Sequence, residues 1–517
     1  MNSIASRLDR AIASLPRLFP GPGGALAVLR EGEVLARHTW GWANAERRIA
    51  FTPRSLFRMC SITKQFTCAA VLTHTDDPRT LDAGIKARLP RLEGEVPNAL
   101  HLAHNQSGLR DYWAVAMLHG SPVEAPFGDT ESAKVIAGTR SLHFAPGTRY
   151  SYVNQNFRLL SDALEEKTGR GFSELLRPIF ARAGMESAFI AADTRAMPDG
   201  TEGYEGTQAS GFRAAENRII WTGDAGMGAS LEDMIAWERF IDATRDETDG
   251  LYNRLAAPVT FADGTPAHYG FGLARSDEWG RSITGHGGAL RGWRSHRLYV
   301  AGERISVVVM FNHLSDAQAA AMNLLAATLG EDPPAPGGSS IPATWPGAYI
   351  EPETGLAVRI DTKGEGRLGL RFGHGSEGLA MQADGTAGRD GTLLREEGGA
   401  LRMIRPSENM NTALRPAGGE PGTDIGGRFR CAELEAELTI EVTGGVPYGG
   451  FSGFLGQGRM ELLDPIAADL WALPCPRALD QTPPGDWTLA FRRDAAGKVD
   501  AVEVGCWLAR GLLYERA

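Results

Sequence analysis

The sequence has little cysteine and no long apolar run. Its 517 residues include five cysteines, at Cys60, Cys68, Cys431, Cys475 and Cys506. Their odd number and irregular spacing argue against a disulfide framework and a cysteine-based metal site, and favour buried, reduced thiols. No apolar run approaches the roughly 18 residues that indicate a membrane-spanning helix. The sequence therefore predicts no membrane partner.

The sequence also lacks a surplus of positive charge, and its first residues lack the apolar stretch expected of a signal peptide. The chain has 53 Lys and Arg against 63 Asp and Glu, a formal net charge of −10. Non-specific nucleic-acid binding needs a basic surface and is disfavoured. Near the start, Ile4, Leu8, Ile12 and Leu15 have the spacing of an amphipathic helix, not the continuous apolar stretch of a signal peptide. We expect a cytoplasmic protein that binds no nucleic acid.

The order of expected elements describes an α+β domain over residues 1–331. Segments 25–30 and 34–39 flank a Glu-Gly-Glu turn and predict a hairpin. Segments 283–289, 295–300 and 305–311 predict further strands. Residues 61–72, a segment capped by Ser230, and residues 317–329 predict helices. Strands at both ends with helices between them favour one antiparallel sheet flanked by helices.

The remaining chain has a different pattern. Residues 332–339 are rich in Pro and Gly and end the first domain. Short alternating segments with glycine turns then predict two small antiparallel β-barrel domains, at 339–416 and 423–517. We expect the linker between them at residues 416–422. Related units are indicated because four residues recur at the same spacing: Gly347, Tyr349, Glu353 and Ile360 return as Gly427, Phe429, Glu433 and Ile440.

Ser61 and Lys64 lie three residues apart at the predicted start of a helix. Residues i and i+3 share a helix face, so the Lys64 amine can stand beside the Ser61 hydroxyl. Serine is a poor nucleophile until a neighbouring base takes its proton. Lysine becomes such a base when desolvation or nearby positive charge lowers its pKa. Most Ser-x-x-Lys matches are accidental, so this pair alone is a weak signal.

Two later segments strengthen the interpretation. Tyr152 and Asn154 form Tyr-x-Asn, and His286 begins a His-x-Gly segment. In this order the three motifs resemble those of the penicillin-recognising serine hydrolases, a β-lactamase-like family. The resemblance implies a β-lactamase/transpeptidase-like catalytic domain. It also implies Ser61 as nucleophile and Lys64 as acylation base, alone or with Tyr152, whose pKa we expect neighbouring ammonium charge to lower.

The same resemblance assigns binding roles. Asn154 would hydrogen-bond the lysine and the substrate amide, His286 would line the opposite wall, and Gly288 would also bind substrate. The backbone N–H groups of Ser61 and Ala289 would form an oxyanion hole, in which one lost donor typically costs about 3–4 kcal/mol of barrier. Structural alternatives stay open: a half-buried aromatic at 152, a turn cap at 154 and a plain loop histidine at 286.

The third motif carries information about the substrate. Family members with Lys at this place have a fixed positive charge for a C-terminal carboxylate, whereas His286 is mostly neutral at pH 7. A carboxypeptidase is therefore disfavoured. A hydrolase of amides, esters or N-terminal residues is favoured.

A catalytic domain followed by two barrel-like units is similar to the arrangement of the D-aminopeptidases. This resemblance implies removal of N-terminal D-residues, above all D-alanine, and suggests a homodimer with β-lactams as candidate inhibitors. It also implies that a loop of the last domain, here 476–486, enters the cleft, where Asp480 would bind the substrate ammonium. Ala274 stands where a polar side chain would be expected to help.

Two other functions remain open. An esterase or β-lactam hydrolase would use the same catalytic residues without needing Asp480. A non-catalytic sensor would bind D-amino peptides through the tail barrels. No cofactor or metal is implied, because the sequence shows neither a ligand cluster nor a phosphate-binding glycine motif.

Overall fold

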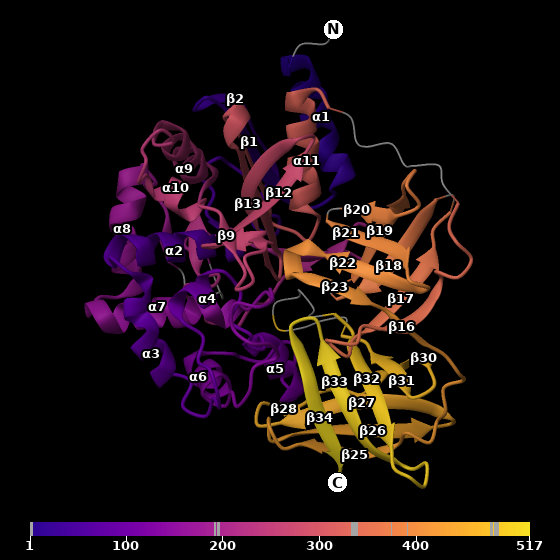
Figure 1. The fold of residues 1–517 in the computed structure, drawn as a ribbon. Coiled ribbons are helices and arrows are strands. Elements are labelled where there is room, and N and C mark those ends of the chain that lie inside the picture. The colour runs from indigo at the N-terminus through magenta and orange to yellow at the C-terminus, as the bar shows by residue number, and fades with distance from the viewer. Residues whose placement is uncertain are drawn as a thin grey trace.

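The computed structural model describes residues 4–190, 193, 197–331, 340–364, 366–373, 375–389, 391–475, 479 and 485–517. Helices and strands mix up to residue 331, and β-structure dominates afterwards (Figure 1). We call residues 4–331 the N-terminal region, the sheet within 347–417 the middle sheet, and the sheet within 427–516 the C-terminal sheet. The predicted α+β class with barrel-like tail sheets is confirmed, whereas the domain boundaries stay predictions.

An eight-stranded antiparallel sheet forms the centre of the N-terminal region. Its strands, in spatial order, are β11 (Tyr269–Gly270), β12 (Leu273–Glu278), β13 (Arg281–Leu290), β14 (Trp293–Val300), β15 (Ile305–Phe311), β1 (Gly23–Arg30), β2 (Glu33–Asn44) and β3 (Ile49–Ala50). Both faces of β1 are buried: Ala25, Ala27 and Leu29 belong to one hydrophobic cluster, Leu26 and Val28 to the other. Strand side chains alternate between faces, so the sheet is packed on both sides.

Helices cover both faces of this sheet (Figure 1). Their bounds are α1 (Ile4–Leu18), η1 (Cys60–Ile62), α2 (Thr63–His74), η2 (Pro78–Leu81), α3 (Asp82–Ala87), α4 (Ala99–Ala103), α5 (Tyr112–Leu118), α6 (Asp129–Ala137), α7 (Asn154–Thr168), α8 (Phe172–Ala183), α9 (Leu231–Ala243), α10 (Leu251–Leu255), η3 (Ala301–Glu303) and α11 (Ala317–Leu329). Helices α1 and α11 lie side by side, and Leu8 and Leu15 of α1 join the buried cluster of Leu324. The predicted amphipathic helix is confirmed.

Three small sheets lie elsewhere in the described part of the N-terminal region. They are formed by β4 (Phe57–Arg58), β8 (Met227–Ala229) and β5 (Phe189–Ile190), by β6 (Tyr204–Thr207) and β7 (Gly211–Ala214), and by β9 (Val259–Thr260) and β10 (Pro266–Ala267). Among the sequence predictions, the hairpin is confirmed as β1–β2. The predicted cap at Ser230 is also confirmed, because its hydroxyl accepts the Asp233 N–H at the start of α9.

The tail contains two antiparallel, barrel-like sheets. The middle sheet runs β23 (Met410–Ala413), β22 (Ala400–Arg405), β21 (Thr392–Glu397), β20 (Ala387–Arg389), β19 (Gly375–Met381), β18 (Arg367–Phe372), β17 (Ala357–Thr362), β16 (Gly347–Ile350) and β24 (Arg415–Ala417), with η4 (Pro406–Glu408) between β22 and β23. The C-terminal sheet runs β28 (Gly456–Gln457), β27 (Val446–Gly453), β26 (Ala436–Thr443), β25 (Gly427–Cys431), β34 (Ala509–Arg516), β33 (Val499–Cys506), β32 (Trp487–Arg493), β31 (Leu470–Leu473) and β30 (Asp464–Ala467), and β29 (Glu461–Leu462) pairs with β27.

The internal repeat is visible in the strand register. Gly347 pairs with Ile360 in the middle sheet, and Gly427 pairs with Ile440 in the C-terminal sheet. The expected linker at 416–422 is wrong at its start, because residues 416 and 417 belong to β24 and pair with β16. Pro416 lies on β24, which ends the strand order of the middle sheet, and an end strand tolerates a residue without a backbone N–H.

Two further expectations can be compared with the described residues. All five cysteines are buried and free, as predicted. Within the described ranges, no helix has the length and apolar character needed to cross a bilayer.

Candidate active site

Ser61 lies in a tight turn that leads into α2. The preceding residue, Cys60, has φ 53°, in the left-handed region that costs a non-glycine residue roughly 1–2 kcal/mol. Thr63 pins the turn, because its hydroxyl donates to the Cys60 carbonyl at 2.6 Å and accepts the Met227 N–H at 3.0 Å. Such local strain persists only where the surroundings enforce it. The turn therefore sets the Ser61 hydroxyl in a defined position at the start of the helix.

The Lys64 amine stands beside that hydroxyl. Nζ lies 3.0 Å from Ser61 Oγ, and the lysine side chain is fully buried. Nζ also donates to Asn154 Oδ1 at 2.9 Å and to the Asp224 carbonyl at 2.8 Å. The structure thus brings the two residues of the first motif together with one residue of the second, inside the protein.

Tyr152 lies next to the lysine, whose Nζ is 4.9 Å from the centre of the tyrosine ring. Burial raises the pKa of Tyr152 well above its ordinary value, and the Tyr150 and Asp111 charges add to this, while a hydrogen bond with Ser61 opposes it. The expectation that an ammonium group would lower this pKa is wrong, because loss of hydration dominates. Tyr152 is a neutral phenol at physiological pH and can donate a proton in a hydrogen bond.

Asn154 is held by a carboxylate that the sequence analysis did not single out. The first residue of α7, it donates to Asp111 Oδ2 both from its backbone, at 2.6 Å, and from its side-chain amide, at 3.0 Å. Asp111 is fully buried and also accepts the Trp113 and Ala114 N–H groups as the N-cap of α5. Burial raises its pKa to about 6. The N-cap pattern was readable from sequence, but its contact with Asn154 was not.

His286 lies on β13, across the site from Lys64. Its Nε2 is 2.9 Å from the Tyr269 hydroxyl, and its Nδ1 is 2.5 Å from the Gly287 carbonyl. Since a carbonyl only accepts, the neutral ring carries its proton on Nδ1 and accepts the tyrosine hydroxyl at Nε2. Burial lowers the histidine pKa to about 3. The histidine is therefore neutral at pH 7, as the sequence analysis expected, and Tyr269 is a partner that it missed.

Gly288 brings β13 against the turn that carries the serine. A Cβ atom at this position would lie 2.4 Å from the Met59 carbonyl and 2.3 Å from Ser295 Oγ, so only glycine fits. Ala289 follows on the same strand and pairs with Arg294. The strand segment 286–289 therefore lies beside the Ser61 turn.

The predicted substrate loop is only partly described. Asp480 lies outside the described residues, as do 476–478 and 481–484. Asp486, near the end of the segment, forms an ion pair with Arg359 of the middle sheet at 3.1 Å. Ala274 is exposed on β12 and pairs with Gly285. Among the described residues, no group of three or more His, Cys, Asp or Glu side chains could hold a metal ion.

This geometry is suited to nucleophilic catalysis. A hydroxyl within hydrogen-bonding distance of a buried amine, with a neutral phenol beside both, is the arrangement that activates a serine. The described cluster joins Ser61, Lys64, Tyr152, Asn154 and His286.

The chain is similar to curated proteins over almost its full length. A protein of Gluconobacter oxydans (strain 621H) named D-aminopeptidase is 60% identical over 525 residues, which cover 100% of this chain and 99% of that protein. The chain belongs to the D-aminopeptidase family. A D-aminopeptidase of Brucella melitensis biotype 1 is 46% identical over 510 residues, covering 98% of each chain. The family model "D-aminopeptidase, domain B" matches residues 339–515.

The N-terminal region matches a broader family as well. The family model "Beta-lactamase" matches residues 12–331. A solved structure, the octameric penicillin-binding protein homologue from Pyrococcus abyssi, aligns with a TM-score of 0.52 at 19% identity, covering 79% of this chain and 99% of that chain. The predicted β-lactamase/transpeptidase-like fold of this D-aminopeptidase family member is confirmed.

Proposed function

We propose that this chain removes N-terminal D-residues, above all D-alanine, from peptides, amides and esters through an acyl-enzyme on Ser61. Its membership of the D-aminopeptidase family supports the reaction. The observation that carries the proposed chemistry is the 3.0 Å separation between Lys64 Nζ and Ser61 Oγ.

Lys64 acts as the base of the acylation step. A neutral amine has two N–H donors and one lone pair, and the Asn154 Oδ1 and Asp224 carbonyl oxygens can only accept. The two N–H groups of the neutral amine therefore face these oxygens, and its lone pair faces the serine hydroxyl. Ser61 passes its proton to Lys64 as Oγ forms a bond to the substrate carbonyl carbon.

The resulting tetrahedral species needs two further contributions. Its oxyanion is stabilised by the backbone N–H groups of Ser61 and Ala289, since donors aimed at developing charge stabilise the transition state. The proton on Lys64 moves to the leaving amine through the Tyr152 hydroxyl, which gives up one proton and receives another. The C–N bond then breaks, leaving the D-aminoacyl group esterified to Ser61.

Water completes the cycle. It attacks the ester carbonyl while Lys64, with Tyr152, accepts its proton, and Ser61 Oγ leaves and is reprotonated. The two products of the full cycle are the free D-amino acid and the shortened peptide, amine or alcohol. The enzyme returns to its starting protonation state.

Substrate selection involves the wall opposite the lysine and the loop of the last domain. Neutral His286 offers no fixed charge to a C-terminal carboxylate, which disfavours carboxypeptidase activity. Asp480 binds the N-terminal ammonium by charge complementarity. We also propose a cytoplasmic homodimer and inhibition by β-lactams, which present a carbonyl that serine can attack.

The test uses matched D- and L-alanine p-nitroanilides with the full-length protein. Hydrolysis of the D-isomer at least 100-fold faster than the L-isomer is expected, with an acyl adduct on Ser61 detected by mass spectrometry after acid quench. Ser61→Ala and Lys64→Met should each lose at least a thousandfold in kcat while keeping the melting temperature of the parent. Hydrolysis of p-nitrophenyl acetate or a β-lactam alone would favour the esterase alternative, and absence of any turnover would favour the sensor.

A further inference from the structure

A glutamate at the equivalent position of each tail repeat binds an arginine of the N-terminal region. Arg149 donates to Glu353, in the turn between β16 and β17, at 2.5 Å, and Arg110 donates to Glu433, in the turn between β25 and β26, at 2.9 Å. Arg149 comes three residues before Tyr152. Each glutamate of the repeat thus binds an arginine that lies close in sequence to a residue of the candidate active site.

The C-terminal contact is the more deeply buried of the two. The Arg110 side chain is 7% exposed, against 31% for Arg149. Solvent screens the exposed pair and weakens it, whereas a buried charge depends on its partners. Besides Glu433, Arg110 Nε donates to the Arg510 carbonyl at 2.8 Å. Arg110 is therefore anchored to the C-terminal sheet by two groups.

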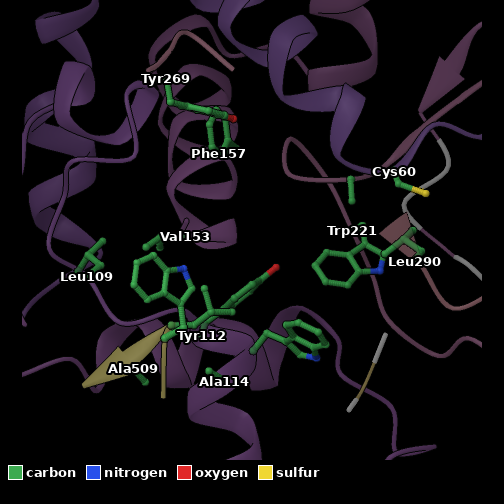
Figure 2. Close-up of a cluster of buried hydrophobic side chains, with 14 of the residues drawn as sticks. Cys60, Leu109, Tyr112, Ala114, Val153, Phe157, Trp221, Tyr269, Leu290 and Ala509 are labelled. Atoms are coloured by element: carbon green, nitrogen blue, oxygen red, sulfur yellow. The ribbon is translucent and has the colours of Figure 1, made fainter. Parts of the chain in front are cut away.

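The next residue, Asp111, is tied to the same sheet through its backbone. Its N–H donates to the Leu508 carbonyl at 2.9 Å. Figure 2 shows Ala509, which follows Leu508, close to Tyr112 and Ala114 at the start of α5. The turn between β33 and β34 therefore packs against the backbone that carries the Asp111 carboxylate.

The Asp111 carboxylate decides which way the Asn154 amide points. Oδ2 accepts from the Asn154 side-chain nitrogen at 3.0 Å, and a carboxylate cannot donate. The amide oxygen must then face the other way, where it accepts from Lys64 Nζ at 2.9 Å. With the amide reversed, an NH₂ group would face the amine, donor against donor, and Lys64 would lose one of the acceptors that fix it beside Ser61.

We propose that Asp111 is a positioning residue of the catalytic centre, and that the C-terminal sheet holds it in place through Leu508 and Arg110. This inference rests on the proposed function, because positioning Lys64 matters only if Lys64 activates Ser61. It gives the C-terminal sheet a second role, separate from that of its substrate loop. The Asp111 carboxylate binds Asn154 and the first N–H groups of α5, and it acts on Lys64 through Asn154.

The decisive variant is Asp111→Asn. Asparagine also caps helices well, so α5 should keep its cap. The Asn154 backbone N–H at the start of α7 loses its acceptor, so the melting temperature should fall, and kcat is therefore compared per folded molecule. One side-chain oxygen is replaced by NH₂, however. If the remaining oxygen caps α5, the new NH₂ faces Asn154 and favours the reversed amide. We expect kcat on D-alanine p-nitroanilide to fall 30- to 100-fold with KM within threefold of the parent, and the rate of Ser61 acylation to fall equally.

A purely structural role for Asp111 predicts a different result. It would lower the melting temperature and leave kcat per folded molecule unchanged, and that outcome would overturn the proposal. Failure of the proposed function is recognised separately: parent enzyme without an adduct on Ser61, together with an active Ser61→Ala variant, would refute the serine mechanism whatever Asp111→Asn does.

The role of the C-terminal sheet is tested by Arg110→Met, which removes the bonds to Glu433 and to the Arg510 carbonyl and also those to Ser141 of the N-terminal region. We expect about a tenfold loss of kcat. The matched control is Arg492→Met, which breaks an exposed ion pair with Glu503 on the same sheet and should leave kcat unchanged. If Arg110→Met does not fold, Glu433→Gln tests the same contact and should lower kcat two- to fivefold. Parent-like kcat in the folded variant would show that the sheet does not position the site.

Discussion

The Tyr269 hydroxyl on β11 donates to Nε2 of His286 on β13 at 2.9 Å, across the intervening strand β12. Both side chains are buried, at 5% and 6% exposure. Removing the hydroxyl leaves a buried nitrogen without its donor, which typically costs about 1–3 kcal/mol. Tyr269→Phe should therefore lower both the melting temperature and kcat, and calorimetry and steady-state kinetics would detect the changes. A variant with parent-like stability and kcat would show that this hydrogen bond does not order the site.

Gly288 offers a sharper steric prediction. Gly288→Ala would set a methyl group 2.4 Å from the Met59 carbonyl, so β13 and the Ser61 turn must separate. We expect a loss of about 1–3 kcal/mol in stability, as for overpacked cores, and at least a tenfold loss in kcat. The control is Gly302→Ala, because a Cβ atom there would have no neighbour within 4 Å. Equal behaviour of the two variants in thermal unfolding and kinetics would contradict the predicted clash.

The assignment of Asp480 is tested by substrate pairs. Asp480→Asn removes the charge proposed to bind the substrate ammonium but leaves the serine chemistry intact. On D-alanine p-nitroanilide we expect kcat/KM to fall at least 50-fold, whereas p-nitrophenyl acetate, which has no amine, should be hydrolysed within twofold of the parent rate. Equal losses on both substrates, or none on either, would refute the role.

The buried histidine at 313 makes stability depend on pH. Burial, with the Arg294 charge, lowers its pKa in the fold to about 3, whereas an unfolded histidine titrates near 6.5. The unfolded chain therefore binds an extra proton between these values, and stability falls as pH drops below about 6.5. At pH 5 this one residue contributes a loss of about 2 kcal/mol.

His313→Gln should remove that share of the acid sensitivity. The difference in unfolding free energy between pH 7.5 and pH 5.0, measured by denaturant titration, should be smaller than in the parent. The exposed residue His38 supplies the control, and His38→Gln should keep the full difference. An unchanged pH dependence in His313→Gln would mean that the ring is protonated in the folded protein too.

Much of the site follows from local sequence. Ser61 and Lys64 share one turn of helix, and i, i+3 spacing is enough to predict that their side chains meet. Motif order supplied Tyr152, Asn154 and His286, which the fold gathers around the lysine. The hairpin, the cap at Ser230 and helix α11 were readable for the same reason, since each depends on residues close in sequence.

The missed residues depend on tertiary contacts. Asp111 meets Asn154 across 43 positions, and nothing in a local pattern pairs them. Asn105 was not among the residues predicted for the site. In the structure it adopts φ 54°, which asparagine tolerates better than most residues, and its side-chain oxygen accepts the Val153 N–H at 3.2 Å. The direction of the Tyr152 pKa shift was missed because burial is a property of the fold.

The paired glutamates at 353 and 433 have a consequence for engineering. Cutting the protein after residue 331 would keep every motif that suggested a serine hydrolase, so the sequence of the fragment would give no sign that anything is missing. The fragment would lose the tail glutamates that bind Arg110 and Arg149 and admit water behind the aspartate at 111. A minimal catalyst built from this scaffold must therefore replace the contacts that the C-terminal sheet makes with Arg110 and Asp111, as well as the substrate loop.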